Sequence, residues 1–511
     1  MIRESNFIIQ HTEWRKEFMK KKIVSLLLSS AMVIGLLAGC GGAASSASTA
    51  TSAASAAAST ATASKADTSS KADTSSKADA SKADTSEASK TTTSDGTVGK
   101  NKFVDGGTDM SLWTFQELHV DFYTAMADKW NEEHPDKPIN LTVTTGESTA
   151  MHTKMLVALQ SGTGAPDICD IEIGHFATFL QGGYLLPLND AVKPYEDDVV
   201  MSRIKMYGDN DGNYYGIDFH LGASVAYYNM DIMNAAGVDP STIETWDDYY
   251  NAGLKVLEKT GKPMCAVETA DLFLPQLMCL EKGCQYVTDD GKPDIATQDH
   301  ADAINFIRKM IKAGICEIAP GGGFHTEEWY AHLNGGGVAS ICMPLWYMGR
   351  FTDYCSDLKG KMGIYEIPVW NKGDTRCVLQ GGTGTGVTNQ SKNADLAKEF
   401  LAFAKLSEEG CRSEWELLGF DPIRTSLWSD TSMTQDKSNK FISYFATNPF
   451  DVLNSVKDAY GVDLTAPNIK GSYSATYSVL VSTTYSNAFE NEPDTDALEL
   501  LKSEQDTIIT S

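Results

Sequence analysis

The chain has 511 residues, of which 68 are acidic and 42 basic, so its formal net charge is −26. A surface this acidic is repelled by nucleic acid and by anionic lipid, so we expect no nucleic-acid partner. The length is sufficient for two domains after an N-terminal leader.

The N-terminus has the organisation of an export signal. Three lysines at 20–22 precede an uncharged, apolar run at 26–37. This run is shorter than the roughly 20 apolar residues that span a bilayer, so we interpret 19–39 as a cleaved signal peptide. Because Met19 already begins a complete signal, 1–18 are interpreted as an over-extended start. An uncleaved anchor is the alternative.

The first cysteine, Cys40, ends the tetrapeptide LAGC. This sequence resembles the lipobox of bacterial lipoprotein signals, in which the cysteine becomes the lipidated first residue of the mature protein. The resemblance implies that a lipid on Cys40 attaches the chain to a membrane.

A low-complexity segment follows the cysteine. From 41 to 102 the only apolar residue larger than alanine is Val98, and the tetrapeptide SKAD occurs four times. Without apolar side chains to bury, nothing offsets the entropy of ordering the segment. We therefore predict that 40–102 form a disordered tether.

The other nine cysteines lie at 169, 265, 279, 284, 316, 342, 355, 377 and 411, with no C-x-x-C spacing. An odd number scattered over a long chain does not indicate a disulfide framework, so we expect buried free thiols. One bridge, between Cys279 and Cys284, stays open as an alternative.

Strands and helices alternate after the tether. The sequence predicts strands at 110–115, 139–145 and 166–173, and helices at 119–135 and 148–162. The first helix carries Phe122, Met126 and Trp130 at four-residue spacing, which is typical of an amphipathic helix. This order predicts an α/β fold whose parallel sheet has helices on both faces and binds ligands at the carboxyl ends of its strands.

Five blocks carry a resemblance to a known family. They lie at 154–190, 212–252, 335–351, 379–405 and 417–428, and include GNYYGIDFHLGASVAYYN, GGGVASICMPLWYMGRF and LLGFDPIRTSLW. In this order they resemble the extracellular solute-binding proteins of ABC importers, family 1, which includes the maltose-binding proteins. The resemblance covers most of the chain beyond 103.

The resemblance implies a two-lobed fold of the type II periplasmic-binding-protein class. Strands cross between two α/β lobes, and the ligand lies in the cleft between them. Carried onto this sequence, lobe 1 comprises 103–219 and 377–420, and lobe 2 comprises 220–376 and 421–511.

Candidate ligand-binding residues follow from the predicted strand ends and crossings. Sugar sites combine aromatic faces with side chains that hydrogen-bond hydroxyl groups. Trp346 and Trp113 are the leading candidates. The full set is Trp113, Glu117, Glu172, His175, Phe219, His220, Glu268, Asp271, Trp346, Tyr347, Gln380, Gly382, Asp421 and Arg424.

Two motifs suggest metal sites but depart from the required pattern. The segment 209–218 has the alternating acids of a calcium loop, yet Tyr214 occupies the position of the turn glycine and His220 that of the bidentate glutamate. HTEEW at 325–329 lacks the second histidine of a zinc helix. We expect a turn at 209–218, and neither a metal nor a cofactor.

These features predict an exported, lipid-anchored, monomeric protein that faces outside the cytoplasm. We expect it to capture a sugar, for which a neutral oligosaccharide is our hypothesis, and to deliver it to ABC permease subunits without altering it. One alternative is an exported glycosidase that uses two carboxylates some 5 to 10 Å apart. Another is a surface adhesin or ligand-presenting sensor with the same fold.

Overall fold

The computed structural model describes residues 88–93 and 96–510. The predicted over-extended start, the signal peptide and Cys40 lie outside these residues. Within the described part, two separate main sheets organise the chain.

The first sheet has the strand order β1-β2-β4-β3-β5-β11. Its central strands β4, β3 and β5 are parallel, and Leu112 of β3 pairs with both Val143 of β4 and Ile168 of β5. The bounds of the six strands are β1 Ser89–Thr93, β2 Gly96–Lys100, β3 Thr108–Thr114, β4 Ile139–Thr145, β5 Ile168–Glu172 and β11 Thr383–Val387.

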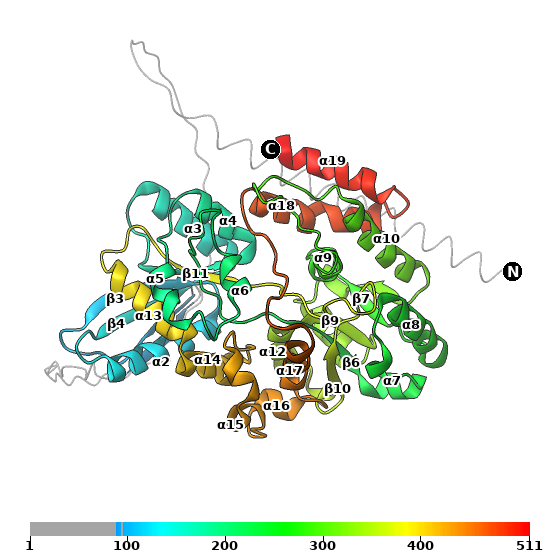
Figure 1. The fold of residues 1–511 in the computed structure, drawn as a ribbon, viewed down its shortest axis with the longest axis horizontal. Helices are drawn as coiled ribbons and strands as arrows, with labels where there is room; N and C mark the ends of the chain where they lie inside the picture. The colour runs from blue at the N-terminus through cyan, green and yellow to red at the C-terminus, as the bar shows by residue number, and fades with distance from the viewer. Residues whose placement is uncertain (1–87, 94–95, 511) are drawn as a thin grey trace, which may run out of the picture. The chain divides into compact units, whose positions relative to one another are not determined.

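Helices cover both faces of this sheet, as the sequence predicts. Apolar residues of α2 and α13 pack on one face, whereas those of α3 and α4 pack on the other. Figure 1 shows α3 and α4 at one face and α2 at the opposite one. The helix bounds are α2 Glu117–Glu133, α3 Ser148–Ser161, α4 Ile173–Gln181, α5 Asn189–Val192, α6 Met201–Lys205, α13 Ala394–Leu406 and α14 Glu408–Ser413.

The parallel arrangement is limited to the three central strands. β11 joins β5 in the antiparallel direction, with Thr383 opposite Glu172. The reason is connectivity, because β11 arrives from the second sheet along a crossing segment and does not follow a helix of the first sheet. A crossover through a helix is what makes a parallel neighbour.

The predicted tether extends too far, because 89–93 and 96–100 form two paired strands. β1 pairs antiparallel with β2, and β2 pairs antiparallel with β4. Backbone hydrogen bonds hold β2 even though Val98 is 37% exposed. At Gly99, an added Cβ would come within 2.3 Å of Val120, so the absence of a side chain permits close packing on α2. The prediction considered only apolar side chains and missed strand addition to an open sheet edge.

The second sheet is antiparallel, with the order β10-β6-β9, and β7 and β8 form a separate parallel pair. The strands are β6 Ser224–Asn229, β7 Cys265–Val267, β8 Cys316–Ile318, β9 Ser340–Pro344 and β10 Met362–Glu366. Figure 1 shows α7 and α8 beside β6. The helices are α7 Met230–Ala236, α8 Trp246–Thr260, α9 Phe273–Leu280, α10 Gln298–Lys312, α11 Glu327–Asn334 and α12 Met348–Tyr354.

Three segments cross side by side between the sheets. Ala223 pairs with Leu379 in an isolated antiparallel bridge, and Ile217 pairs likewise with Thr385. The third segment contributes Asp421, whose backbone oxygen accepts from the amide of Leu221 at 2.9 Å. The prediction of lobes joined by crossing strands is confirmed.

The C-terminal region contacts both halves. Its helices are α15 Thr431–Thr434, α16 Lys440–Tyr444, α17 Pro449–Tyr460, α18 Tyr473–Val479 and α19 Ala497–Thr510. α17 packs on β10, whereas α18 contacts α4 of the first half as well as α19. The predicted lobe 2 contained all of 421–511, so it did not anticipate the contact between α18 and α4.

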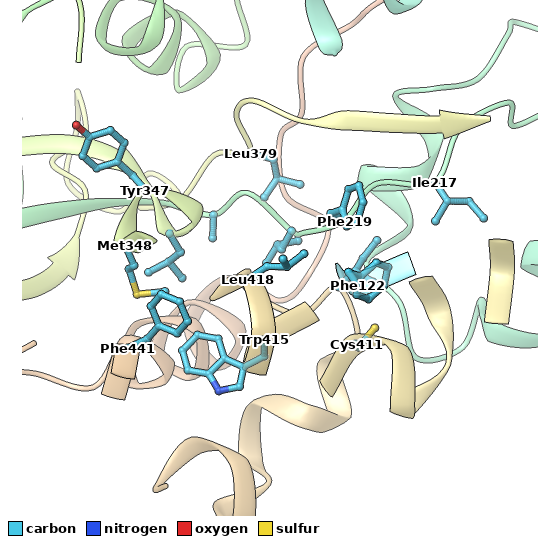
Figure 2. Packing of buried hydrophobic residues seen from close by; sticks show 14 of the residues in the cluster. Phe122, Ile217, Phe219, Tyr347, Met348, Leu379, Cys411, Trp415, Leu418 and Phe441 are labelled. Carbon is cyan, nitrogen blue, oxygen red and sulfur yellow. The ribbon is translucent and has the colours of Figure 1, made fainter. Parts of the chain in front are cut away.

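A continuous apolar core runs through the crossing segments. Phe219 and Leu379 are fully buried in it. Figure 2 shows Trp415 beside Phe441, whose ring centre lies 5.7 Å away. All nine cysteines of the described residues are buried free thiols, as expected. Across 88–93 and 96–510, no helix combines the length and the apolar character needed to cross a membrane.

Candidate ligand-binding site

A cavity of about 340 Å³ lies where the crossing segments meet the ends of β5 and β9. Both halves of the described unit line it, as the predicted interlobe cleft requires. Its walls combine aromatic rings, carboxylates, amides and cationic groups. Its lining includes Phe115, Gln116, Glu172, His220, Asp271, Phe273, Gln276, His325, Trp346, Arg350, Gly382, Phe420, Tyr473 and Tyr477.

Five of the predicted residues line this cavity. They come from separate predicted strand ends and crossings, and they are Glu172, His220, Asp271, Trp346 and Gly382. Their convergence supports the sequence argument that strand ends of both lobes face a shared cleft.

Trp346 follows β9 in a short 3₁₀ turn, Leu345–Tyr347. Its ring is half-buried and lies at 5.4 Å from Phe273, edge to face, and at 5.8 Å from His325, nearly parallel. Its Nε1 donates to the backbone oxygen of Gln380 at 3.3 Å. Gly381 has a φ of 67°, and a Cβ there would come within 2.9 Å of the indole, so glycine is required for this approach.

Glu172 and Asp271 bring two carboxylates from different halves to the same cavity. Glu172 caps α4 by accepting from the amide of Gly174 at 3.1 Å, and Asp271 accepts from the amide of Leu272 at 2.8 Å. Burial, together with the charge of Asp271, raises the pKa of Glu172 to about 7. Burial raises the pKa of Asp271 to about 6. Both carboxylates therefore have unused capacity to accept hydrogen bonds from a ligand.

His220 lies on the first crossing segment and is nearly buried. Its Nδ1 accepts from Arg203 at 3.3 Å, and its ring centre lies 6.2 Å from that of Trp346. Burial lowers the pKa of His220 to about 3, so the imidazole is neutral. Its Nε2 lies 3.8 Å from Asp218 Oδ1, so both ring nitrogens face buried protein groups, and the neutral ring itself forms part of the cavity wall.

Three predicted residues lie on the first half without lining the cavity. Trp113, at the end of β3, is half-buried beneath the ammonium of Lys154, which lies 4.3 Å from its ring centre. Glu117 is exposed at the start of α2 and accepts from Thr97 Oγ1 at 3.2 Å. His175 stacks on His152 at 4.4 Å. Each is directed to another partner of the first half.

Two predicted aromatic residues are core residues. Phe219 is fully buried, with its ring 3.9 Å from that of His119 and 3.3 Å from Lys405 Nζ. Tyr347 is also fully buried, and its hydroxyl donates to the backbone oxygen of Phe324 at 2.6 Å. Neither lines the cavity, because both side chains point into the apolar core.

Gln380 and Glu268 lie behind the cavity wall. Gln380 Nε2 donates to Gln276 Oε1 at 3.1 Å, and Gln276 lines the cavity. Glu268 Oε1 accepts from the amide of Phe324 at 2.7 Å, while its buried Oε2 has no hydrogen-bond partner among the described residues. Both side chains support lining residues and do not line the cavity themselves.

Asp421 and Arg424 hold the third crossing segment in place. Asp421 Oδ2 accepts from the amide of Ala223 at 2.9 Å. Arg424 forms an ion pair with Asp198 at 2.8 Å and donates to the backbone oxygen of Leu406. Neither residue lines the cavity, although their neighbour Phe420 does.

Several lining residues are not among those predicted from the sequence. Tyr473 and Tyr477 belong to α18, far along the chain from every block that was used. Gly174 allows Tyr477 to lie close to α4, since an added Cβ would be 2.8 Å from its ring. His325 was considered only within a zinc motif. Arg350 had a usable signal, because it follows Trp346 by four residues in a block that was already singled out.

The calcium-like segment forms a turn, as predicted. Asp209 accepts from the amides of Asp211 and Asn213 at 2.9 Å each, and Gly208 bridges Tyr214. Backbone donors therefore occupy the carboxylate that a cation would need. In the part of the chain that the structure describes, no three His, Cys, Asp or Glu side chains are grouped to hold a metal ion.

A cavity between two α/β lobes, walled by aromatic rings and hydrogen-bonding groups, defines a solute-binding protein of the two-lobed type. The chain belongs to the family of bacterial extracellular solute-binding proteins, whose model matches residues 116–410. The resemblance drawn from the sequence blocks is thereby confirmed, and the family consists of binding proteins.

Curated relatives are named for sugars. An arabinooligosaccharide-binding protein of Halalkalibacterium halodurans is 46% identical over 358 residues, which cover 70% of this chain and 80% of the relative. One with the same description from Bacillus subtilis is 42% identical over 363 residues, covering 70% and 83%. A lactose-binding protein of Rhizobium radiobacter is 25% identical over 307 residues, covering 57% and 69%.

Solved structures share the fold. The galacto-N-biose-/lacto-N-biose I-binding protein of Bifidobacterium longum, in complex with lacto-N-biose, has a TM-score of 0.64 at 16% identity, covering 79% of this chain and 97% of that one. The binding protein of B. animalis subsp. lactis in complex with β-1,6-galactobiose has a TM-score of 0.63 at 19% identity, with the same coverage. At these identities the likeness is one of fold.

Proposed function

We propose that this protein binds a neutral oligosaccharide and delivers it to an ABC permease. One observation carries the proposal: Trp346, other aromatic rings and the two carboxylates Glu172 and Asp271 line the same cavity between the lobes. Aromatic faces stack on sugar rings, while carboxylates accept from hydroxyl groups. The relatives named above make arabinooligosaccharides the first ligands to test.

The charge of the cavity favours a neutral ligand. Glu172 and Asp271 would repel a uronic or phosphorylated sugar placed between them. Two cationic side chains also line the cavity: Lys440 is paired with Asp353 at 3.1 Å, whereas Arg350 is unpaired among the described residues and lies at the outer end, away from the space between the two carboxylates. A neutral sugar avoids this repulsion and still uses both carboxylates as acceptors.

The direct test is calorimetric titration of the full-length protein, in detergent, with arabinooligosaccharides from the disaccharide to the hexasaccharide. Thermal unfolding is measured in parallel, because a ligand at a hundred times its dissociation constant adds about 2.7 kcal/mol of stability. Oligogalacturonides serve as the anionic control. Binding of the anionic series alone would contradict the proposal.

We further propose that the protein is exported and attached to a membrane through lipid on Cys40, acting as a monomer. The support is the lipobox-like LAGC and the low-complexity segment that follows it. Cys40→Ser should release the protein from the membrane fraction while its sugar affinity stays unchanged. Sedimentation of the Cys40→Ser protein with membranes would contradict the anchor.

We propose that the bound sugar is not altered. Two carboxylates in a cavity are also the groups that a glycosidase uses, so the alternative has a specific observation behind it. Mass spectrometry of the ligand after incubation with stoichiometric protein separates the two. A product that forms with the wild type but not with Glu172→Gln would support the enzyme.

A further inference from the structure

The cavity continues into an outer groove. This groove has a volume of about 550 Å³ and includes Lys90, Glu117, Asp121, Glu327, Tyr330 and Tyr354 in its walls. Five residues, Gln116, Leu118, His325, Arg350 and Asp353, line both the cavity and the groove. The two spaces are therefore successive parts of one cleft, with the groove on the solvent side.

Flat side chains continue from the cavity into the groove. His325 is solvent-exposed and lies nearly parallel to Trp346, with an interplanar angle of 16°. Further out, Tyr354 stacks on Tyr330 at 4.3 Å and 3°. Tyr330 covers one face of Tyr354, yet Tyr354 is 47% exposed, so its other face is available for stacking. A sugar ring in the groove would find the same kind of surface that Trp346 provides inside.

Arg350 lies at the junction and has donors to spare. The guanidinium is half-buried, and no hydrogen bond or ion pair joins it to any of residues 88–93 or 96–510. The neighbouring lysines are paired, since Lys90 binds Asp121 at 2.9 Å and Lys440 binds Asp353 at 3.1 Å. Arg350 alone among these groups keeps its five N–H donors for a ligand or for water.

We propose that the outer groove binds the outward end of the same oligosaccharide, with Tyr354 as its stacking surface and Arg350 as its hydrogen-bond donor. The site then takes a linear chain by one end. That end is enclosed beside Trp346, Glu172 and Asp271, and the remainder leaves through the groove. This inference rests on the proposed function and specifies its substrate class as linear chains longer than the inner cavity holds.

The first experiment is a chain-length series on the full-length protein and on Tyr354→Ala. We expect the wild-type affinity to rise with chain length until the groove is filled and then to stay constant. Tyr354→Ala should bind the longest chains about tenfold more weakly and the shortest chain equally well. Arg350→Met should show a loss that grows with chain length. Tyr250→Ala, an aromatic truncation on α8 away from both spaces, is the matched control.

The second experiment needs no variant. A bulky fluorescent group is attached to one end or to the other end of the longest chain. We expect a label on one end to be tolerated and a label on the other end to prevent binding. Tolerance of both labels, or of neither, overturns the inference.

The outcomes separate the inference from the proposed function. If the shortest chain binds but Tyr354→Ala affects all lengths equally or none, the groove has no role while the proposed function stands. If no arabinooligosaccharide binds the wild type at any length, the proposed function fails and the inference fails with it.

Discussion

Two groups of buried charges lie near each other in this molecule and differ in their partners. At the first crossing segment and the adjoining strand β5, Arg203 forms an ion pair with Asp218 at 2.8 Å, and Asp170 accepts from Tyr123 at 2.6 Å. In the cavity, Glu172 and Asp271 each accept only from a nearby backbone amide. A carboxylate whose hydrogen-bond and ion-pair partners are protein groups serves to hold the fold together. A carboxylate with few protein partners can accept hydrogen bonds from a ligand.

The pKa values separate the same two groups. Burial alone would raise the pKa of Asp218, but the charge of Arg203 keeps it below its ordinary value. Burial likewise acts on Asp170, yet its hydrogen bond with His119 and the charge of Lys405 bring its pKa to about 2. The pKa of Glu172 is about 7, because no cation compensates for its burial. In the structural group, a nearby cation offsets the effect of burial on the carboxylate pKa, whereas Glu172 of the cavity has no such cation.

The largest expected effect tests the structural group. Arg203→Met leaves Asp218 as a buried charge without its partner, so the free energy of unfolding should fall by roughly 3 to 5 kcal/mol. Urea denaturation measures this loss. Arg424→Met, which removes a partly exposed ion pair, should cost less. Equal losses in the two variants would contradict the conclusion that the fully buried pair depends more strongly on its partner than the partly exposed pair does.

Trp346→Ala tests the cavity group. We expect the free energy of sugar binding to weaken by roughly 2 to 4 kcal/mol, because the stacking surface is lost. The same truncation at Trp113, which lies outside the cavity, should leave the affinity nearly unchanged. Calorimetric titration of both variants measures the difference. A larger loss of affinity in Trp113→Ala than in Trp346→Ala would indicate that the sugar binds beside Trp113 instead.

Asp271→Asn tests the cavity carboxylates. Replacing a charged acceptor by a neutral one should weaken sugar binding by roughly 1.5 to 3 kcal/mol, the range for hydrogen bonds to charged groups. Thermal stability should not fall, because the carboxylate has an unfavourable environment without ligand. A stability loss with unchanged affinity would make Asp271 structural.

The smallest effect is a pH dependence. The folded-state pKa of Glu172, about 7, lies above its ordinary value of 4.5, so its contribution to stability is present at low pH and is lost as the pH rises through 7. Glu172→Gln removes this loss and keeps an acceptor for Gly174. The melting temperature of the variant should exceed that of the wild type at pH 8, with the difference vanishing by pH 4. A melting-temperature difference that stays constant from pH 4 to pH 8 would contradict the raised pKa of Glu172.

The sequence predicted the fold better than it predicted the site. Strand and helix periodicity located β3, β4, β5, α2 and α3, because burial on a sheet imposes that pattern on the residues themselves. Strand ends pointed to Glu172, Asp271 and Trp346, which line the cavity, while their role in ligand binding stays a prediction.

The remaining lining residues depend on tertiary contacts. Tyr473 and Tyr477 reach the cavity only because α18 packs on α4, and their four-residue spacing is that of any amphipathic helix. Phe219 and Tyr347 were chosen for their position along the chain, whereas their burial depends on neighbours that sequence order does not specify. Local patterns predict elements, but a cavity is formed by elements that are distant in the chain.

The most direct test is a crystal structure of the protein with a bound arabinooligosaccharide. We expect a sugar ring against Trp346, with hydroxyl groups within hydrogen-bond distance of Glu172 and Asp271. A sugar bound beside Trp113 and Glu117, with the cavity around Trp346 filled only by water, would contradict it.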